Sequence, residues 1–339
     1  MANRKKSNKR LPDFGGQGYV EYFSSTTFDN ISEIFDKYSF GVTTHRDHFV
    51  VGFTQEEIKQ KMRTFVSNLT DDLVALALDL KETTDFKINT ARLSIKKMDW
   101  KEYIRPYSYR PFDDRHICYL KDLIDRDRSE IMQHIMDKDN LALSLTRRLR
   151  DHAWQHIYAT QYITDKTLLS SRDNCYFFPL YLYQEKSKSR KRSLGSAMML
   201  FEPEADYGAK KPNLSADVVD RLAKAYRKTP SPEEIFYYIY GVLYSETYRT
   251  KYAEFLKIDF PRVPFTKNYK LFKQISKYGN RLVDLHLLRS PELDSPIAKF
   301  QGKGDYRVER LKYDEKTGRV YINATQYFGD IAQTAPLEI

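Results

Sequence analysis

Cysteine is almost absent from this sequence. Only Cys118 and Cys175 occur among the 339 residues. Two cysteines cannot form a disulfide framework, and alone they cannot supply the four ligands of a structural zinc site. Such sparse cysteine usage is typical of proteins from a reducing compartment, so we expect a cytoplasmic protein.

Long apolar runs are absent as well. No stretch approaches the roughly 20 consecutive apolar residues that a membrane helix needs. The basic start, residues 1–6, is not followed by the apolar segment of a secretory signal. A hydrophobic fraction of 41% is nevertheless enough for a sizeable core. We therefore expect a folded protein without a membrane partner.

Glycine is scarce, which bears on nucleotide chemistry. The 13 glycines form neither a G-x-x-x-x-G-K-[ST] phosphate loop nor a G-x-G-x-x-G fingerprint, and the glycine-dense segment 15–18 has no strand before it. No Pro-Pro pair occurs, so the Asp/Asn-Pro-Pro-Tyr/Phe segment of amino-methyltransferases is missing too. We expect no cofactor in this chain.

Signatures of other catalytic centres are missing or weak. A G-x-S-x-G nucleophile motif is absent. The fragments Asp-Phe-Lys at 85–87 and Glu-Ile-Lys at 57–59 match only the last part of a metal-dependent nuclease pattern, which a chain with 30% charged residues contains by chance. His152 and His156 have i, i+4 spacing, but further zinc ligands are lacking nearby, so we interpret them as structural. We expect neither a metal site nor catalytic machinery in this chain.

Positive charge is what the chain has in excess. Lysine and arginine number 56 against 46 acidic residues, a formal net charge of +10. Basic side chains that neutralise phosphates release condensed counterions, so this excess favours a polyanionic partner. The alternative is a merely basic protein. The 26 tyrosines and 20 phenylalanines mostly fill the core, although a tyrosine hydroxyl can also reach a phosphate.

The order of the hydrophobic patterns predicts an α+β fold in four segments. Residues 1–25 are a basic flexible arm, and 26–100 form a helical connector with a strand-like run at 48–53. Residues 101–210 alternate short strands with one helix, which is typical of a compact α+β domain. Residues 211–339 predict a helical subdomain that is closed by a β-hairpin.

Helix and strand positions follow from caps and periodicity. Thr54, Ser215 and Ser231 are expected N-caps, and Pro232 stands at the first helical position after Ser231. The expected helical stretches are 55–97, 128–136, 235–244, 246–255 and 267–288. The expected strands are 117–119, 141–145, 156–160 and 176–183, with the hairpin at 305–313 and 319–323.

One basic cluster follows directly on the apolar run 141–145. It comprises Arg147, Arg148 and Arg150, at the end of an expected strand, where loops present contacts. Arginine can read guanine O6 and N7 bidentately or clamp a phosphate. The alternative is a solvated strand end whose arginines pair with Asp151 and similar acids.

Two further basic clusters are present. One lies in the polar loop 185–192 and suits phosphate contact without base reading, or is only a solvated loop. The other alternates in sign with aspartates at 113, 114, 125 and 127, which favours internal ion pairing. The loop cluster is Lys186, Lys188, Arg190, Lys191 and Arg192, and the alternating cluster is Arg110, Arg115, Arg126 and Arg128.

Several longer motifs follow one another in order. They include Tyr-Arg-Pro-Phe-Asp-Asp-Arg at 109–115, Asn-Leu-Ala-Leu at 140–143 with Thr-Arg-Arg at 146–148, Tyr-Phe-Phe-Pro-Leu-Tyr-Leu-Tyr at 176–183, Pro-Asn-Leu-Ser at 212–215 and Pro-Glu-Glu-Ile-Phe-Tyr-Tyr at 232–238. Over roughly residues 38–328 the sequence thereby resembles the C-terminal specificity region of type ISP restriction–modification enzymes, which contain adenine-N6 DNA methyltransferases. Residues 40–47 resemble the junction that follows the methyltransferase core.

The resemblance implies sequence-specific recognition of double-stranded DNA, with residues 101–210 as the target-recognition domain. It implies that the methyltransferase and the helicase–nuclease region lie outside this chain, in cis or in trans, and that S-adenosylmethionine, ATP and Mg belong to the parent enzyme. Arg147, Arg148 and Arg150 are then the candidates for base contacts, and the 185–192 cluster for phosphate contacts. Target-reading surfaces diverge with their targets, so the matching motifs are expected to be scaffold.

Two other functions stay open from the sequence. In the first alternative, the chain is a divergent S-adenosylmethionine-dependent methyltransferase, and saturable binding of that cofactor would favour this function. In the second alternative, the chain is a protein-interaction scaffold of a restriction–modification complex, and an absence of duplex binding at moderate salt would favour this function. The missing phosphate loop and Pro-Pro motif count against the first.

Overall fold

The fold combines helices with several small sheets, as the α+β prediction requires. The computed structural model describes residues 22, 28–150, 154, 156–183, 210–295 and 298–329. Contacts divide the chain into two compact units, residues 1–287 and 288–339. The predicted four-segment division stays a prediction.

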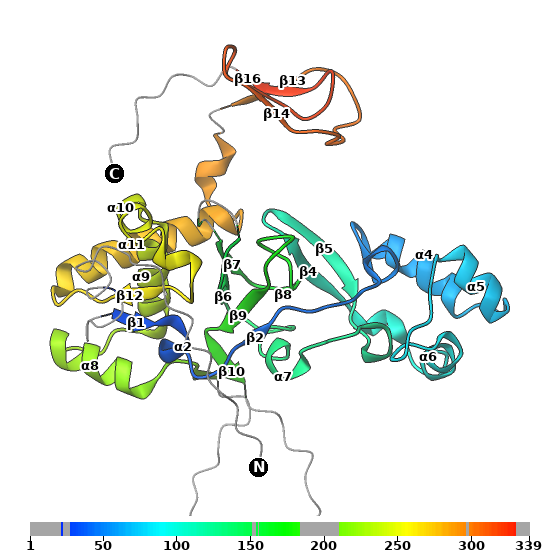
Figure 1. Cartoon of the computed structure of the whole chain (residues 1–339), viewed down its shortest axis with the longest axis horizontal. Helices are drawn as coiled ribbons and strands as arrows, with labels where there is room; N and C mark the ends of the chain where they lie inside the picture. Colours follow the sequence, from blue (N-terminus) through cyan, green and yellow to red (C-terminus); the bar gives the residue numbers. More distant parts are fainter. Residues whose placement is uncertain are drawn as a thin grey trace, which may run out of the picture. The chain divides into compact units, whose positions relative to one another are not determined.

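A four-stranded antiparallel sheet lies at the centre of the first unit (Figure 1). Its strands, in spatial order, are β2 (Ser39–Phe40), β9 (Cys175–Pro179), β6 (Ala142–Thr146) and β7 (Ile157–Thr160). Every residue of β6 and β7 is buried, which explains the continuous apolar run in the sequence. The predicted strands at 141–145 and 156–160 are confirmed. The strand predicted at 176–183 is in fact two strands in two different sheets, β9 in this one and β10 (Tyr181–Tyr183) in another.

A second sheet has the order β3 (Val51–Gly52), β5 (Asp113–Cys118), β4 (Ile104–Arg110) and β8 (Ile163–Thr164). Its pairs are antiparallel except β4 with β8. Two isolated strand pairs are also present among the described residues of this unit: β1 (Phe28–Asn30) with β12 (Arg262–Pro264), and β10 (Tyr181–Tyr183) with β11 (Lys210–Pro212).

The helices near the second sheet correct two predictions. The expected helix 55–97 is three helices, α4 (Gln55–Phe65), α5 (Asp71–Ala77) and α6 (Ile88–Ile95). The buried Arg92 donates to the carbonyls of Phe65, Ser67 and Leu69 and so holds the break between α4 and α5. Within the strand-like run 48–53 only β3 is extended, because residues 47–50 form the helical turn α3 (Asp47–Val50).

Short helical turns join the strands. They are α2 (Ile31–Ile34), α7 (Ser129–Met132), and the 3-10 turns Trp100–Tyr103, Lys121–Leu123 and Phe255–Lys257. The helix expected at 128–136 is reduced to α7. Arg128 precedes it in a left-handed conformation, with φ of 56°, so the helix cannot begin there.

Four helices pack on the other side of the central sheet (Figure 1). They are α8 (Ala216–Tyr226), α9 (Pro232–Tyr244), α10 (Glu246–Lys251) and α11 (Tyr269–His286). The Ser231 hydroxyl accepts from the Glu234 N–H, and the Glu234 carboxylate accepts from the Ser231 N–H. The predicted cap is therefore a complete capping box. Thr54 also caps as predicted, whereas Ser215 holds the cap position without a side-chain hydrogen bond.

Tyrosine hydroxyls fasten these helices to the neighbouring backbone. Tyr226, Tyr238 and Tyr248 donate to the carbonyls of Thr266, Pro264 and Arg262, each over 2.6 Å. The three rings are buried while their hydroxyls find partners, as buried tyrosine requires. Much of the high tyrosine content is therefore structural.

Glycine allows α9 and α11 to cross closely. A Cβ atom on Gly279 would lie 1.8 Å from the Tyr237 carbonyl oxygen, and one on Gly241 would lie 2.9 Å from the Ile275 carbonyl oxygen. Both obstacles are backbone atoms, so neither can swing away as a side chain would. The contact requires glycine at position 279.

Replacing Gly279 with alanine should therefore destabilise the first unit. We expect the free energy of unfolding to fall by about 1–3 kcal/mol, because the helices must separate to admit the methyl group. Urea denaturation followed by circular dichroism measures this loss. Lys277→Ala, at an exposed position of the same helix, is the matched control, and equal stability of the two variants would contradict the close crossing.

His286 ends α11 among aromatic rings. Its Nδ1 lies 2.7 Å from the Tyr240 hydroxyl, which itself accepts from the Ala159 N–H, and the Tyr244 ring centroid is 4.8 Å away. Desolvation by burial, with the positive charge of Arg249 as the smaller cause, lowers the pKa of His286 below its ordinary 6.5. The site therefore favours the neutral imidazole.

Stability should accordingly decrease on acidification. Between pH 6.5 and the lowered folded-state pKa, the unfolded histidine binds a proton that the folded one does not. Stability is therefore greatest above the unfolded pKa and falls by up to about 1.4 kcal/mol per pH unit within this window. Urea titrations at stepped pH should show a weaker decrease for His286→Gln than for the native chain. Identical decreases would contradict the prediction.

The second unit contains a four-stranded antiparallel sheet. The order is β13 (Lys299–Gln301), β16 (Tyr327–Gly329), β15 (Arg319–Tyr321) and β14 (Lys312–Asp314), and a 3-10 turn, Pro291–Asp294, precedes it. The predicted hairpin is confirmed, with a shorter first strand than expected. Residues 302–311 form a loop because Gly302 and Tyr306 have φ of 99° and 63°, outside the strand region.

Candidate nucleic-acid interface

The predicted arginine cluster lies where the chain leaves the central sheet. Strand β6 ends at Thr146, and Arg147, Arg148 and Arg150 are exposed in the loop that follows. Between them Leu149 is buried and its N–H donates to the Lys257 carbonyl over 3.1 Å. This anchor holds the loop against the segment after α10, so the arginines project from a fixed backbone.

The loop forms one wall of a hollow with a volume of about 590 Å³. We call it the basic groove, because five cationic side chains and one carboxylate line it. Its residues are Arg147, Arg148, Leu149, Arg150, Arg172, Asp173, Asn174, Tyr176 and Lys257. The groove joins segments that are far apart in the sequence. Arg172 and Lys257 were missed by the sequence analysis, since neither stands in a local basic cluster.

The three predicted arginines differ in their partners. Arg147 Nε donates to Asp259 Oδ1 over 2.6 Å, which raises the pKa of Arg147, and its guanidinium lies 5.4 Å from the Phe260 ring centroid. Arg150 Nε lies 3.5 Å from Asp173 Oδ1. Within the part of the chain that the structure describes, the Arg148 side chain makes neither an ion pair nor a hydrogen bond.

Ion pairing is therefore real for two members of the cluster. The partners are Asp259 and Asp173, whereas Asp151, the acid expected from the sequence, lies outside the described residues. The Arg150 side chain is still 75% exposed, so its pairing leaves the guanidinium accessible. The acids orient Arg147 and Arg150, and Arg148 is the member whose donors have no competing partner among the described residues.

Asp173 is the buried acid of the groove. It accepts from the Arg150 N–H over 3.2 Å, and its own N–H donates to Ser170 Oγ over 3.1 Å. Lys257 pairs with Glu254 over 2.7 Å. These contacts fix the groove wall before any partner arrives, which reduces the entropy lost on binding.

The predicted phosphate contacts lie elsewhere in the chain. Lys186, Lys188, Arg190, Lys191 and Arg192 fall in 184–209, outside the described residues. Their assignment stays a prediction.

The alternating cluster is largely neutralised by internal pairs, as predicted. Arg110 lies 3.1 Å from Asp165, Arg115 lies 2.7 Å from Asp113, and Arg126 lies 3.9 Å from Asp125. Arg115 is also sandwiched between the rings of Phe53 and Tyr109, at 4.2 and 4.1 Å. Three of the four arginines therefore pair internally, whereas Arg128 makes no ion pair among the described residues.

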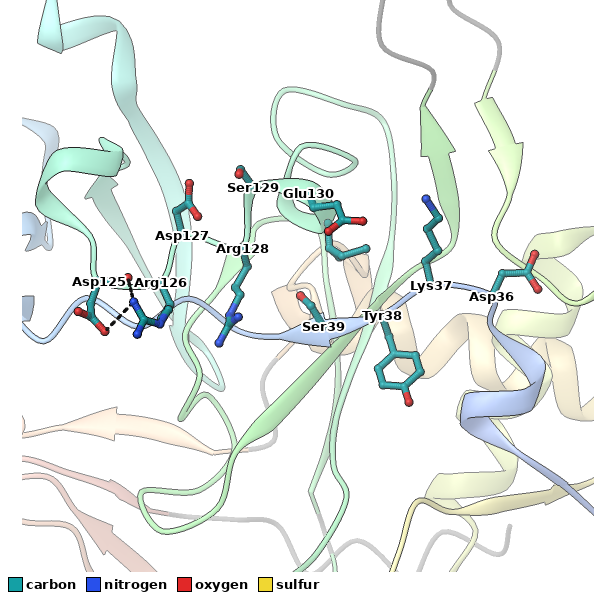
Figure 2. A pocket seen from close by; sticks show the side chains of 11 residues that line it. Asp36, Lys37, Tyr38, Ser39, Asp125, Arg126, Asp127, Arg128, Ser129 and Glu130 are labelled. Atoms are coloured by element: carbon teal, nitrogen blue, oxygen red, sulfur yellow. Dashed lines mark hydrogen bonds and ion pairs between the residues drawn. The ribbon is translucent and has the colours of Figure 1, made fainter. Parts of the chain in front are cut away.

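A second hollow, of about 610 Å³, contains part of that cluster. Figure 2 shows the residues that line it, from 36–39 and from 125–130, with Asp125 and Arg126 joined by an ion pair. Four acids, Asp36, Asp125, Asp127 and Glu130, stand against three bases, Lys37, Arg126 and Arg128. This balance is less suited to a polyanion than the basic groove, where cations dominate.

Metal-ligating clusters and reactive cysteines were sought among the described residues. No group of three or more His, Cys, Asp and Glu is placed there to hold a metal ion. Burial raises the pKa of the Cys118 thiol to about 12 and raises that of Cys175 further, so neither is a thiolate at neutral pH. Among the described helices none is both long and apolar enough to span a membrane.

The fold is similar to that of solved DNA-bound enzymes. The structure of the ATP-dependent type ISP restriction–modification enzyme LlaBIII bound to DNA matches 88% of this chain, with a TM-score of 0.63 and 22% identity. A DrdV–DNA complex matches 87% of this chain, with a TM-score of 0.64 and 24% identity. A nuclease-deletion mutant of the type ISP enzyme LlaGI, in complex with a DNA substrate mimic, matches 94% of this chain, with a TM-score of 0.59 and 19% identity.

The chain is much shorter than these enzymes, of which it covers 19%, 29% and 24%. No curated protein sequence matches it. A family model does match residues 33–335, that of the type ISP C-terminal specificity domain. The chain belongs to this family, which confirms the resemblance predicted from the ordered motifs.

Proposed function

We propose that this chain recognises a specific sequence in double-stranded DNA for a restriction–modification enzyme. It positions that DNA for an adenine-N6 methyltransferase and a nuclease that lie outside the chain. The basic groove is the observation that carries the proposal. It concentrates five cations on a fixed wall, in a member of a specificity-domain family.

The groove provides both kinds of contact that recognition needs. Arginine can donate two parallel hydrogen bonds to guanine O6 and N7, and each such pair discriminates against a wrong base by about 1–3 kcal/mol. Arg148 suits this role because its donors are unoccupied within the described chain. Lys257 and Arg172, at the groove wall, suit phosphate contacts that set the register of the DNA.

The proposal assigns no catalytic step to this chain. The absent phosphate loop and Pro-Pro motif support this. S-adenosylmethionine, ATP and Mg would then serve the parent enzyme. Saturable binding of S-adenosylmethionine to the purified chain would contradict this part of the proposal.

Selection from random duplex DNA tests the main claim. The purified chain is mixed with a randomised duplex pool, and the bound fraction is sequenced at two salt concentrations. We expect an enriched asymmetric motif that survives the higher salt, because base contacts are less salt-dependent than phosphate contacts. A pool without any motif, lost at higher salt, would overturn sequence recognition by this chain.

A further inference from the structure

The C-terminal sheet of residues 298–329 carries positive charge at high density. Seven lysines and arginines stand against four acids, so these 32 residues hold three of the ten net charges of the chain. Six of the seven are exposed and make no ion pair within the described residues. They are Lys299, Lys303, Arg307, Arg310, Lys312 and Lys316.

The strand register sorts the side chains of this sheet onto two faces. Lys312 on β14 pairs with Tyr321 on β15, which pairs with Tyr327 on β16, which in turn pairs with Gln301 on β13. Side chains alternate between faces along each strand, so Lys299 and Arg319 point to the same side as this row. We call this side the lysine–tyrosine face. The opposite face carries Phe300, Tyr313, Val320 and Phe328.

Contacts within the sheet keep the lysine–tyrosine face ordered. The Tyr327 hydroxyl donates to Gln301 Oε1 over 2.8 Å, and the Arg319 guanidinium lies 4.5 Å from the Tyr327 ring centroid. The Tyr321 ring lies 5.2 Å from that of Tyr327, and its hydroxyl has no hydrogen bond within the described part of the chain. The face thus offers two exposed lysines and one free phenolic donor.

The one acid on this face is Asp314, opposite Arg319. Its carboxylate is occupied by the hairpin turn, where it accepts from the Lys316 N–H over 3.1 Å and the Thr317 hydroxyl over 2.9 Å. These hydrogen bonds lower the pKa of Asp314, with the Thr317 contact as the largest cause. The acid is therefore committed to the turn, and the lysines extend beyond it.

We infer that the lysine–tyrosine face is a second DNA-binding surface, which contacts the phosphate backbone and not the bases. Lysine is a point charge that neutralises a phosphate without reading sequence, and a tyrosine hydroxyl can donate to a phosphate oxygen. The inference rests on the proposed function, because it takes duplex DNA as the polyanion. It adds a contact surface in a unit separate from the basic groove.

The salt dependence of binding tests this surface. The affinity of the full chain for a labelled duplex of arbitrary sequence is measured by fluorescence anisotropy over a series of NaCl concentrations. Each phosphate contact contributes about 0.9 to the slope of log affinity against log salt. We expect Lys299→Ala/Lys312→Ala to reduce the magnitude of this slope by about 1.8, because two phosphate contacts are lost. Lys299→Arg/Lys312→Arg should keep the native slope, because both positive charges are kept.

Lys224→Ala/Lys277→Ala, with exposed lysines of α8 and α11, is the matched control and should keep the native slope. The inference would be overturned if Lys299→Ala/Lys312→Ala kept the native slope, or if the control lost as much slope as this variant did. Unchanged DNA binding by the variant would leave a protein partner as the occupant of this face. If the native chain selects no motif but the C-terminal variant still lowers the slope, the proposed function fails and this surface stands. If the native chain binds no duplex, both fail.

Discussion

Replacing Asn213 with alanine is expected to lower the free energy of unfolding by about 4 kcal/mol. The Asn213 side chain is fully buried. Its Oδ1 accepts from the Lys37 N–H over 2.8 Å, and its Nδ2 donates to the carbonyls of Lys37 and Pro179 over 2.8 and 2.7 Å. One amide thus ties the segment before β2 to the end of β9.

The expected loss is large because three backbone groups are affected together. A buried donor or acceptor left without a partner costs about 1–3 kcal/mol, and alanine removes the Asn213 partner of all three backbone groups at once. Thermal or urea unfolding of the purified variants measures the loss. Asn89→Ala is the matched control, since exposed Asn89 makes one hydrogen bond, to Asp71. A loss no greater than that of the control would show that the clamp does not matter.

Removing all three arginines of the β6 loop should produce the largest functional effect. For Arg147→Ala/Arg148→Ala/Arg150→Ala we expect affinity for the selected DNA site to fall by about 4 kcal/mol, or roughly a thousandfold. Affinity for unrelated duplex should fall less, because phosphate contacts elsewhere remain. Titrating labelled specific and unrelated duplexes at one salt concentration gives both values and their ratio.

The matched control removes three exposed cations outside the groove, as Arg63→Ala/Lys224→Ala/Lys277→Ala. It should leave the ratio of specific to unrelated affinity unchanged. An equal loss of affinity for both duplexes in the loop variant would contradict base reading and leave only phosphate contact. Arg148→Ala alone should account for the largest share of the lost discrimination, since Arg147 and Arg150 are held partly by Asp259 and Asp173.

Much of the fold was predictable because its signals are local. The capping box at Ser231, the buried strand β6 and the C-terminal hairpin each follow from neighbouring residues. The break between α4 and α5 was missed, because it depends on Arg92, which reaches back to carbonyls about 25 residues earlier in the chain. A periodic apolar pattern does not reveal such a contact.

The site was predictable only in part for the same reason. The cluster 147–150 is visible as adjacent arginines, but Arg172 and Lys257 join it only through tertiary packing, such as the bond from the Leu149 N–H to the Lys257 carbonyl. The motifs that carried the family resemblance include Asn140 and Asn213, which are buried and hydrogen-bonded to backbone. Their position agrees with the expectation that matching motifs are scaffold.

The composite wall of the basic groove has a consequence for engineering. Its residues come from 147–150, from 172–176 and from position 257. The first and last of these segments are joined by the backbone hydrogen bond from the Leu149 N–H to the Lys257 carbonyl. A chimera that exchanges only the loop after β6 would place new side chains against old neighbours. Transfer of a target sequence between relatives should therefore require all three segments to be transplanted together, while the buried asparagine clamps are left in place.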